Sequence, residues 1–174
     1  MFRKATLSDL DAIASIYDRI HSREEAGLST TGWVRHLYPT RATAQDSIEA
    51  EDMFVLEIDG QVVAAARINQ LQGEEYTHAA WSQQVDASHV MVLHTLAVHP
   101  DAAGRGYGTR FVAFYEEYAA KHNCSWLRLD TNERNAPAYA LYKKLGYNEV
   151  STVPCVFNGI SEVNLICMEK MLYL

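Results

Sequence analysis

The sequence has few of the features that mark several large classes of protein. Its cysteines are Cys124, Cys155 and Cys167, and the lack of Cys-x-x-Cys spacing argues against a disulfide framework or a zinc site. No apolar run approaches the roughly 20 residues that cross a bilayer, and no apolar signal core follows Met1. We therefore expect a cytoplasmic protein with no bound metal and no membrane partner.

Positive charge is also scarce. The chain has 15 Lys and Arg residues against 22 Asp and Glu residues, a formal net charge of −7. Nucleic acids demand a basic face, so we expect none as partner. An acidic protein suits a cationic ligand such as an amine, although acidity often serves solubility alone. With 48% hydrophobic residues, the 174-residue chain is typical of a single globular domain over residues 1–174.

Hydrophobic periodicity predicts strands and helices that interleave around a mixed sheet, the α/β (α+β) class. The predicted strands cover residues 2–5, 53–58, 62–68, 90–98, 126–130, 150–157 and 163–171. The first helix begins near a Ser8 cap, with Asp9 and Asp11 favouring its positive end, and its apolar face runs to Ile20. Further helices are predicted over 43–51, 111–122 and 137–145. Residues 70–89 are expected to form a surface loop or an extended hairpin tip.

The turn between residues 98 and 111 is the most informative segment. Gly104, Gly106 and Gly108 alternate there, so that main-chain N–H groups can converge on an anion at the start of the next helix. A pyrophosphate is the expected guest, although a purely structural turn would also explain the glycines. No Gly-Lys-Ser/Thr ends the turn, as a Walker loop requires, and the glycine spacing does not fit a Rossmann fold.

Two motifs make the chain resemble the GNAT family of acetyltransferases. Residues 96–100 and 104–108 are similar to the strand and pyrophosphate loop of that family, with Ala103 replacing its usual Gln or Arg. Residues 135–147 resemble its Asn-x-x-Ala-x-x-Leu-Tyr-x-x-x-Gly-Phe/Tyr segment at every defined position. The resemblance covers residues 90–150. It implies the GNAT fold, a mixed, mostly antiparallel twisted sheet of about seven strands flanked by about four helices.

The resemblance also implies acetyl-CoA as the acyl donor. The main chain of the glycine turn would bind the pyrophosphate, the strand before it would pair with the pantetheine arm, and Asn135 would contact that arm. The residues implied in cofactor binding are Leu96, Ala97, Val98, Gly104, Arg105, Gly106, Tyr107, Gly108, Thr109, Asn135 and Tyr142.

The same resemblance assigns catalytic roles. Tyr142 would protonate the leaving thiolate, or else it is a packed core aromatic. His94 would remove the proton of the amine, because residues 93–99 are similar to a strand of serotonin N-acetyltransferase in which a histidine is implicated. A water chain, or a hydrogen-bonded core role for His94, stays open, and Asp130 is the second choice as base or substrate contact. The N–H of Leu96 would stabilise the oxyanion.

The acceptor is a small-molecule or peptide amine that the sequence does not name. In this family the loop after the first helix forms one wall of the acceptor site, and here it offers Trp33, Arg35 and Tyr38. Arg35 could hold a carboxylate, whereas Trp33 and Tyr38 could pack on the substrate or simply plug the core. Residues 130–132 and 157–158 could also reach the acceptor, or they could merely cap turns. Alternatives are a non-catalytic CoA-binding module or a transferase of longer acyl groups, and family members are often homodimers.

Overall fold

The computed structural model describes residues 1–173, which form one seven-stranded sheet and four α-helices. The strands are β1 (Phe2–Lys4), β2 (Met53–Ile58), β3 (Gln61–Asn69), β4 (Val90–Val98), β5 (Trp126–Asn132), β6 (Asn148–Phe157) and β7 (Ile160–Met171). The helices are α1 (Leu10–Glu25), α2 (Arg41–Glu49), α3 (Tyr107–Lys121) and α4 (Ala136–Lys144). Short 3₁₀ helices are η1 (Leu7–Asp9), η2 (Glu74–His78), η3 (Ala87–His89) and η4 (Pro100–Ala102). The predicted fold class is confirmed.

The sheet has the strand order β1-β2-β3-β4-β5-β7-β6. Every neighbouring pair is antiparallel except β4 and β5, which run parallel. The predicted turns Asp59-Gly60 and Asn158-Gly159 join β2 to β3 and β6 to β7, and all four residues have positive φ, as tight hairpin turns require. The sheet is therefore mixed and mostly antiparallel, as predicted.

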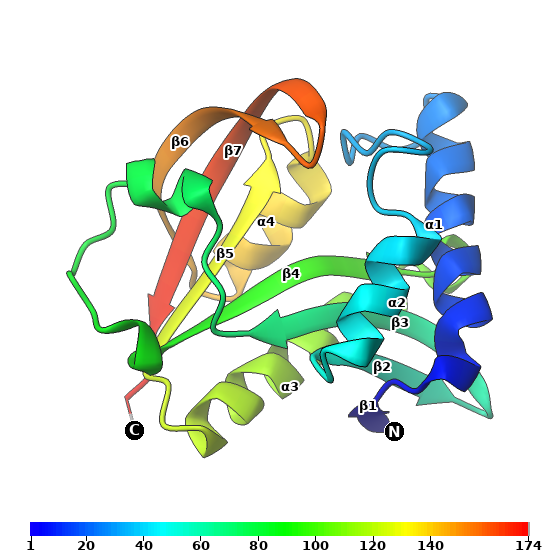
Figure 1. The fold of residues 1–174 in the computed structure, drawn as a ribbon, viewed down its shortest axis with the longest axis horizontal. Coiled ribbons are helices and arrows are strands. Elements are labelled where there is room, and N and C mark those ends of the chain that lie inside the picture. Colours follow the sequence, from blue (N-terminus) through cyan, green and yellow to red (C-terminus); the bar gives the residue numbers. More distant parts are fainter. Residues whose placement is uncertain (174) are drawn as a thin grey trace.

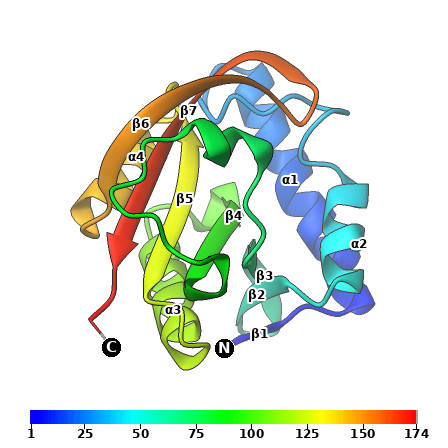
Figure 2. The same cartoon turned by 60° about the vertical axis from the view of Figure 1, so that its left-hand side comes forward.

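Helices cover both faces of the sheet (Figure 2). α1 and α2 bury Ile13 and Ile48 against the face that carries Val55. α3 and α4 bury Phe111 and Tyr142 against the opposite face, which carries Leu56. Because successive strand side chains point to opposite faces, the unbroken apolar run of β2 serves both layers. Among the helices of the described chain, none has the length and apolar character needed to cross a membrane.

The start of α1 differs from the prediction. Thr6, and not Ser8, precedes the first helical turn η1, and its N–H donates to Asp9 Oδ2 at 2.8 Å. Asp9 lies at the positive end of α1, as predicted, but its carboxylate is buried and accepts two hydrogen bonds from Arg3, at 2.7 and 2.8 Å. These bonds lower the pKa of Asp9 to about 2. The carboxylate thus ties β1 to α1.

Residues 70–89, which we call the strap, are mostly exposed, as predicted for a surface loop, but they form two short 3₁₀ helices and no hairpin, and a few of their residues make buried contacts. Tyr76 is buried among residues of β4, β6 and β7. The Trp81 ring lies 4.1 Å from the guanidinium carbon of the buried Arg128, and the Ser82 N–H donates to the buried Glu169 at 2.9 Å. The strap therefore covers one face of the sheet (Figure 1), and its aromatic side chains follow no period that sequence analysis could detect.

Candidate active site

β4 and β5 pair where they begin and then separate. Their parallel ladder runs from Val90 and Trp126 to Leu93 and Leu129 and ends there. Beyond it, β4 stays paired with β3 and β5 stays paired with β7. A wedge therefore opens in the middle of the sheet, visible as the angle between β4 and β5 in Figure 1. Within it, residues 94–98 of β4 have no strand on the β5 side, so their main chain can pair with an extended ligand.

A β-bulge lies at the start of the wedge. The register between β3 and β4 shifts there, so that Thr95 and Leu96 together oppose Ala66. Thr95 has a φ of 52°, which is uncommon for a residue other than glycine. Its hydroxyl shares a hydrogen bond with the hydroxyl of Tyr38. Bulges redirect main-chain groups and side chains beside functional sites, and this one does so next to the open edge of β4.

The glycine-rich turn follows β4. Gly104 and Gly106 have φ values of 77° and 76°, and a Cβ on either would meet open space. α3 begins at Tyr107, four residues before the predicted start, because Gly106 in its left-handed conformation serves as the N-cap. Within residues 1–173, the main-chain N–H groups of 104–109 have no main-chain acceptor. Free donors at the positive end of a 15-residue helix meet the needs of a pyrophosphate.

Close packing behind the turn explains the third glycine. A Cβ on Gly108 would lie 3.2 Å from Cδ2 of Leu141, so a side chain there would require the Leu141 side chain on α4 to shift. The side chains of Arg105 and Thr109 are exposed, and that of Tyr107 is half-buried. The turn therefore stands at the surface, where a nucleotide can reach its main chain.

One cavity, which we call the wedge cavity, lies between the separated strands. Predicted site residues that line it are Trp33, Tyr38, Leu96, Asp130, Asn135 and Tyr142. Ala97 and Val98 are not among the lining residues, because Ala97 packs in the α1 layer and Val98 in the α3 layer. A ligand in the wedge would therefore meet only the main chain of these two residues.

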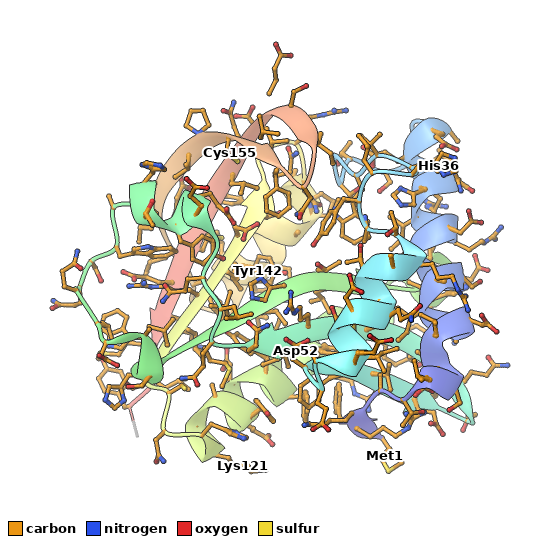
Figure 3. The ribbon with its side chains drawn as sticks, viewed as in Figure 1. Met1, His36, Asp52, Lys121, Tyr142 and Cys155 are labelled. Carbon is orange, nitrogen blue, oxygen red and sulfur yellow. The ribbon has the colours of Figure 1, made fainter. Side chains whose placement is uncertain are left out.

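Tyr142 reaches the wedge from α4 (Figure 3). Its side chain is buried, and the rings of Tyr142 and Tyr147 meet edge to face with centroids 5.9 Å apart. Burial, and then the negative charge of Asp130, raises the pKa of Tyr142, so the hydroxyl keeps its proton at neutral pH. Asn135 caps α4 by accepting a hydrogen bond from the Ala138 N–H at 3.3 Å. The cap fixes the start of the helix that carries the tyrosine.

Asp130 occupies the first position of β5 beyond its ladder with β4. Its Oδ2 accepts a hydrogen bond from the Tyr76 hydroxyl at 2.8 Å. Burial raises the pKa of Asp130 to about 6, and the charge of Glu75 adds to the rise. The carboxylate is therefore mostly ionised at pH 7 but accepts a proton at small cost.

His94 lies on β4, and its Nε2 is 3.0 Å from Asn69 Oδ1. That oxygen also accepts the Leu71 N–H, while Asn69 Nδ2 donates to Asp52 at 2.6 Å. The two contacts fix the amide orientation, so the Nε2–H of His94 donates to Asn69 Oδ1. Burial, and then the positive charge of Arg67, lowers the pKa of His94 to about 4. Its imidazole is neutral at pH 7.

A second hollow, which we call the outer groove, has a volume of about 610 Å³ and includes His94 in its lining. Tyr38, Thr95 and Phe157 line both the groove and the wedge cavity. The Tyr38 and Phe157 rings meet edge to face with centroids 5.5 Å apart. These two rings join the loop after α1 to the β6–β7 turn, which face each other in Figure 1. The two hollows are therefore adjacent and share these three side chains.

The structure does not place all predicted acceptor residues together. Trp33 packs against Tyr17, with ring centroids 6.2 Å apart, and also lines the wedge cavity, so its contact with a substrate stays a prediction. Arg35 lines neither hollow. Its guanidinium pairs with Asp18 and Glu25 of α1, and these two carboxylates hold it away from the site. Arg35 is therefore not free to bind a substrate carboxylate.

Sequence analysis missed four residues of the two hollows or their immediate surroundings. The sequence could have indicated Arg67, because a charged side chain inside an apolar strand usually has a specific partner. The sequence could not have indicated Thr95, because a β-bulge does not change the residue pattern of an apolar run. Glu75 and Tyr76 lie in the strap, whose polar sequence concealed its position beside Asp130.

Known proteins resemble this chain in sequence and in fold. A family model described as Acetyltransferase (GNAT) family matches residues 11–147. The chain is 24% identical over 152 residues to an uncharacterized N-acetyltransferase of Methanocaldococcus jannaschii. That alignment covers 87% of this chain but 62% of the archaeal protein, so the chain spans less than two thirds of this relative.

Two solved structures have the same fold. A GNAT-family acetyltransferase of Streptococcus agalactiae is 21% identical and superposes with a TM-score of 0.83, covering 100% of this chain and 96% of that one. The Salmonella typhimurium protein yncA, a putative acetyltransferase solved with its cofactor acetyl-CoA, is 18% identical with a TM-score of 0.69. Coverage there is 99% of this chain and 94% of that one.

Acetyl-CoA is the cofactor with which yncA was solved. The residues present fit it, because the 104–109 turn offers unpaired N–H donors for a diphosphate and residues 94–98 offer an open strand edge for its extended arm. The family match spans both features and the helix of Tyr142. From the two motifs, the wedge between β4 and β5 and this match, we conclude that the chain belongs to the GNAT family of acetyltransferases.

Proposed function

We propose that this chain transfers an acetyl group from acetyl-CoA directly to a primary amine. When bound, acetyl-CoA supplies an activated thioester and departs as the free thiol. The observation that carries the proposal is that Tyr142 and Asp130 line the same cavity beside the open edge of β4. Direct transfer needs such a pair, because the amine must lose a proton and the departing thiolate must gain one.

Tyr142 is the proposed general acid. Its raised pKa keeps the hydroxyl protonated across the neutral range, and its position on the capped helix α4 holds it in the wedge. A buried phenol beside a developing thiolate supplies a proton that water would otherwise have to carry into a poorly solvated cavity. The role of Tyr142 as acid therefore rests on both its burial and its place.

Asp130 is better suited than His94 to be the general base. With a pKa of about 6, protonation of Asp130 at pH 7 costs about 1.4 kcal/mol. With a pKa of about 4, protonation of His94 costs about 4 kcal/mol. Asp130 also lines the cavity that contains Tyr142, whereas His94 lines the outer groove. We therefore reverse the order of preference that the sequence suggested and give His94 a role in the groove lining.

The bulge gives a physical reason for the proposed oxyanion donor. Thr95 and Leu96 share one partner on β3, which takes part of the local main chain out of the regular ladder. Leu96 also lines the wedge cavity. An N–H group there is fixed before the reaction begins and does not need to reorient as negative charge develops on the carbonyl oxygen.

The experiment combines thiol release with pH profiles. Wild-type protein should release thiol from acetyl-CoA with amines, and Tyr142→Phe should lower kcat about 100-fold without changing the dissociation constant of acetyl-CoA. Tyr139→Phe is the matched control, because that hydroxyl lies on the same helix but is bound to Glu149 at the surface. If acetyl-CoA binds and no amine in a broad panel releases thiol, the proposal is wrong.

The pH profile distinguishes the two bases. A base is active when deprotonated, so kcat/KM should rise with pH through about 6 if Asp130 acts and through about 4 if His94 acts. Asp130→Asn should remove the limb near 6, and His94→Asn should keep it. A profile that rises only near 4, or that is unchanged by Asp130→Asn, contradicts the assignment of Asp130.

Three expectations from the sequence stay predictions. They are a cytoplasmic location, a single domain over residues 1–174 and a homodimer.

A further inference from the structure

The outer groove contains more negative than positive charge. Of its charged side chains, Arg67 donates from Nε to Asp52 at 2.9 Å, so a neighbouring carboxylate offsets its charge. Asp46 and Glu75 also line the groove, and neither carboxylate pairs with a cation elsewhere in residues 1–173. Arg35, the cation expected to receive a substrate carboxylate, is bound to α1. The groove therefore favours cationic over anionic groups.

Glu75 connects this charge to the reaction site. It comes from η2 in the strap, next to Tyr76, whose hydroxyl binds Asp130. Its carboxylate lies over Gly73, where an added Cβ would be 2.0 Å from Oε1, and it is close enough to Asp130 to contribute to the raised pKa of that group. Asp46 lies on α2, on a separate segment. The two carboxylates thus come from different elements that meet around one hollow.

The groove also has an apolar rim. Leu37 is 50% exposed, Leu71 62% and Val156 70%, and all three line the groove. They come from three segments far apart in the sequence: the loop after α1, the strap and β6. Large apolar side chains that remain exposed around one hollow indicate a ligand that covers them. Methylene groups of a substrate would gain from contact with this rim.

From the charge and the rim together we infer that the acceptor is an aliphatic diamine or polyamine. One amino group reacts at the wedge while its methylene chain contacts Leu37, Leu71 and Val156. The second, charged amino group lies near Asp46 and Glu75. This inference rests on the proposed function, since it names the substrate class of the same site. Amino acids and acidic peptides are disfavoured, because their carboxylates would meet these two acids.

Three acceptors with six-carbon chains test how the chemical group opposite the reacting amine affects acetylation. Hexamethylenediamine, hexylamine and ε-aminocaproate present a cation, a methyl group and an anion at the end opposite the reacting amine. We expect kcat/KM for the diamine to exceed that for hexylamine about five- to tenfold, after correction for its two equivalent amines, and ε-aminocaproate to be poorer than hexylamine. The advantage of the diamine should shrink as ionic strength rises.

Substitutions at Glu75 and Asp46 test whether these two carboxylates bind the second amino group. Glu75→Gln and Asp46→Asn should each reduce the ratio of diamine to hexylamine, and the double variant should abolish the excess. Using the ratio cancels any effect of Glu75 on the reactivity of Asp130. Glu74→Gln is the matched control for charge, because Glu74 lies on the same 3₁₀ helix but outside the groove. Val156→Ser should raise KM for both alkyl amines about threefold, whereas Leu28→Ser, equally exposed elsewhere, should not.

The outcomes separate this inference from the proposed function. If hexylamine or ε-aminocaproate is acetylated as well as the diamine, or if the ratio survives in the double variant, the inference is wrong while acetyltransfer stands. If acetyl-CoA binds but none of the three acceptors releases thiol, the inference also fails, and the broader amine panel then decides the proposed function.

Discussion

Replacing Asp130 by Asn should make the protein more stable while it makes the proposed enzyme less active. Burial raises the pKa of Asp130 from 3.8 to about 6. The folded protein therefore disfavours the ionised carboxylate, and the unfolded chain releases its proton at lower pH than the folded protein does. Stability falls as pH rises from about 4 to about 6, and the loss is complete above the folded pKa. Asn resembles the protonated acid in shape and carries no charge to bury.

The magnitude follows from the two pKa values. A difference of about 2 pKa units corresponds to about 3 kcal/mol at pH 8 and to almost nothing below pH 4. An amide oxygen can still accept the hydrogen bond of Tyr76, so that bond does not oppose the gain. Urea unfolding followed by circular dichroism at several pH values between 4 and 8 measures the difference between variant and wild type.

The dependence on pH is the decisive feature. The free energy of unfolding of Asp130→Asn should exceed that of wild type increasingly between pH 4 and pH 6 and by a constant amount above. A difference that does not change with pH, or a variant less stable than wild type at pH 8, would refute the claim that burial of a charge destabilises this position. Acetyl-CoA should be absent in these measurements, because ligand binding adds its own stabilisation.

Two further predictions concern the glycine turn and the β-bulge at Thr95. Gly106→Ala should raise the dissociation constant of acetyl-CoA about tenfold and lower the free energy of unfolding by about 1 kcal/mol, because the φ of 76° at Gly106 disfavours alanine. Gly60 has a similar φ of 75°, so Gly60→Ala should lower stability but leave the affinity for acetyl-CoA, measured by calorimetry, unchanged. Tyr38→Phe removes the hydrogen bond to Thr95 at the bulge and should lower kcat several-fold with unchanged acetyl-CoA affinity. Unchanged affinity in Gly106→Ala, or unchanged kcat in Tyr38→Phe, would contradict the corresponding argument.

The sequence predicted most of the scaffold because its signals are local. Alternating and unbroken apolar runs mark the strands, and Asp59-Gly60 and Asn158-Gly159 mark the hairpins. The two motifs predicted the cofactor and the role of Tyr142, because each motif lies on one continuous segment of the chain. The helix starts were less accurate: Asp9 has an ion-pair partner on β1 that spacing alone does not reveal.

What the sequence could not supply depends on contacts between distant segments. The pairing of β4 with β5 ends after Leu129 although both strands continue, and no residue type announces that end. The proposed preference for Asp130 over His94 as general base depends on the burial of both groups and on charged neighbours from the strap and β3. Arg35 looked available because its partners on α1 lie 10 and 17 residues away in the chain.

The unpaired edge of β4 has a consequence for the behaviour of the protein among other proteins. An exposed strand edge ordinarily recruits strands from other molecules and promotes aggregation. Here the unpaired stretch lies inside the sheet, with β3 paired on one side and β5 beyond the wedge on the other. A foreign strand with side chains on both faces would clash with the helices that cover the sheet, whereas a slender linear molecule could slide in. The wedge thus selects ligands by their thickness. The protein keeps an unpaired strand edge for its ligand without exposing that edge to aggregation.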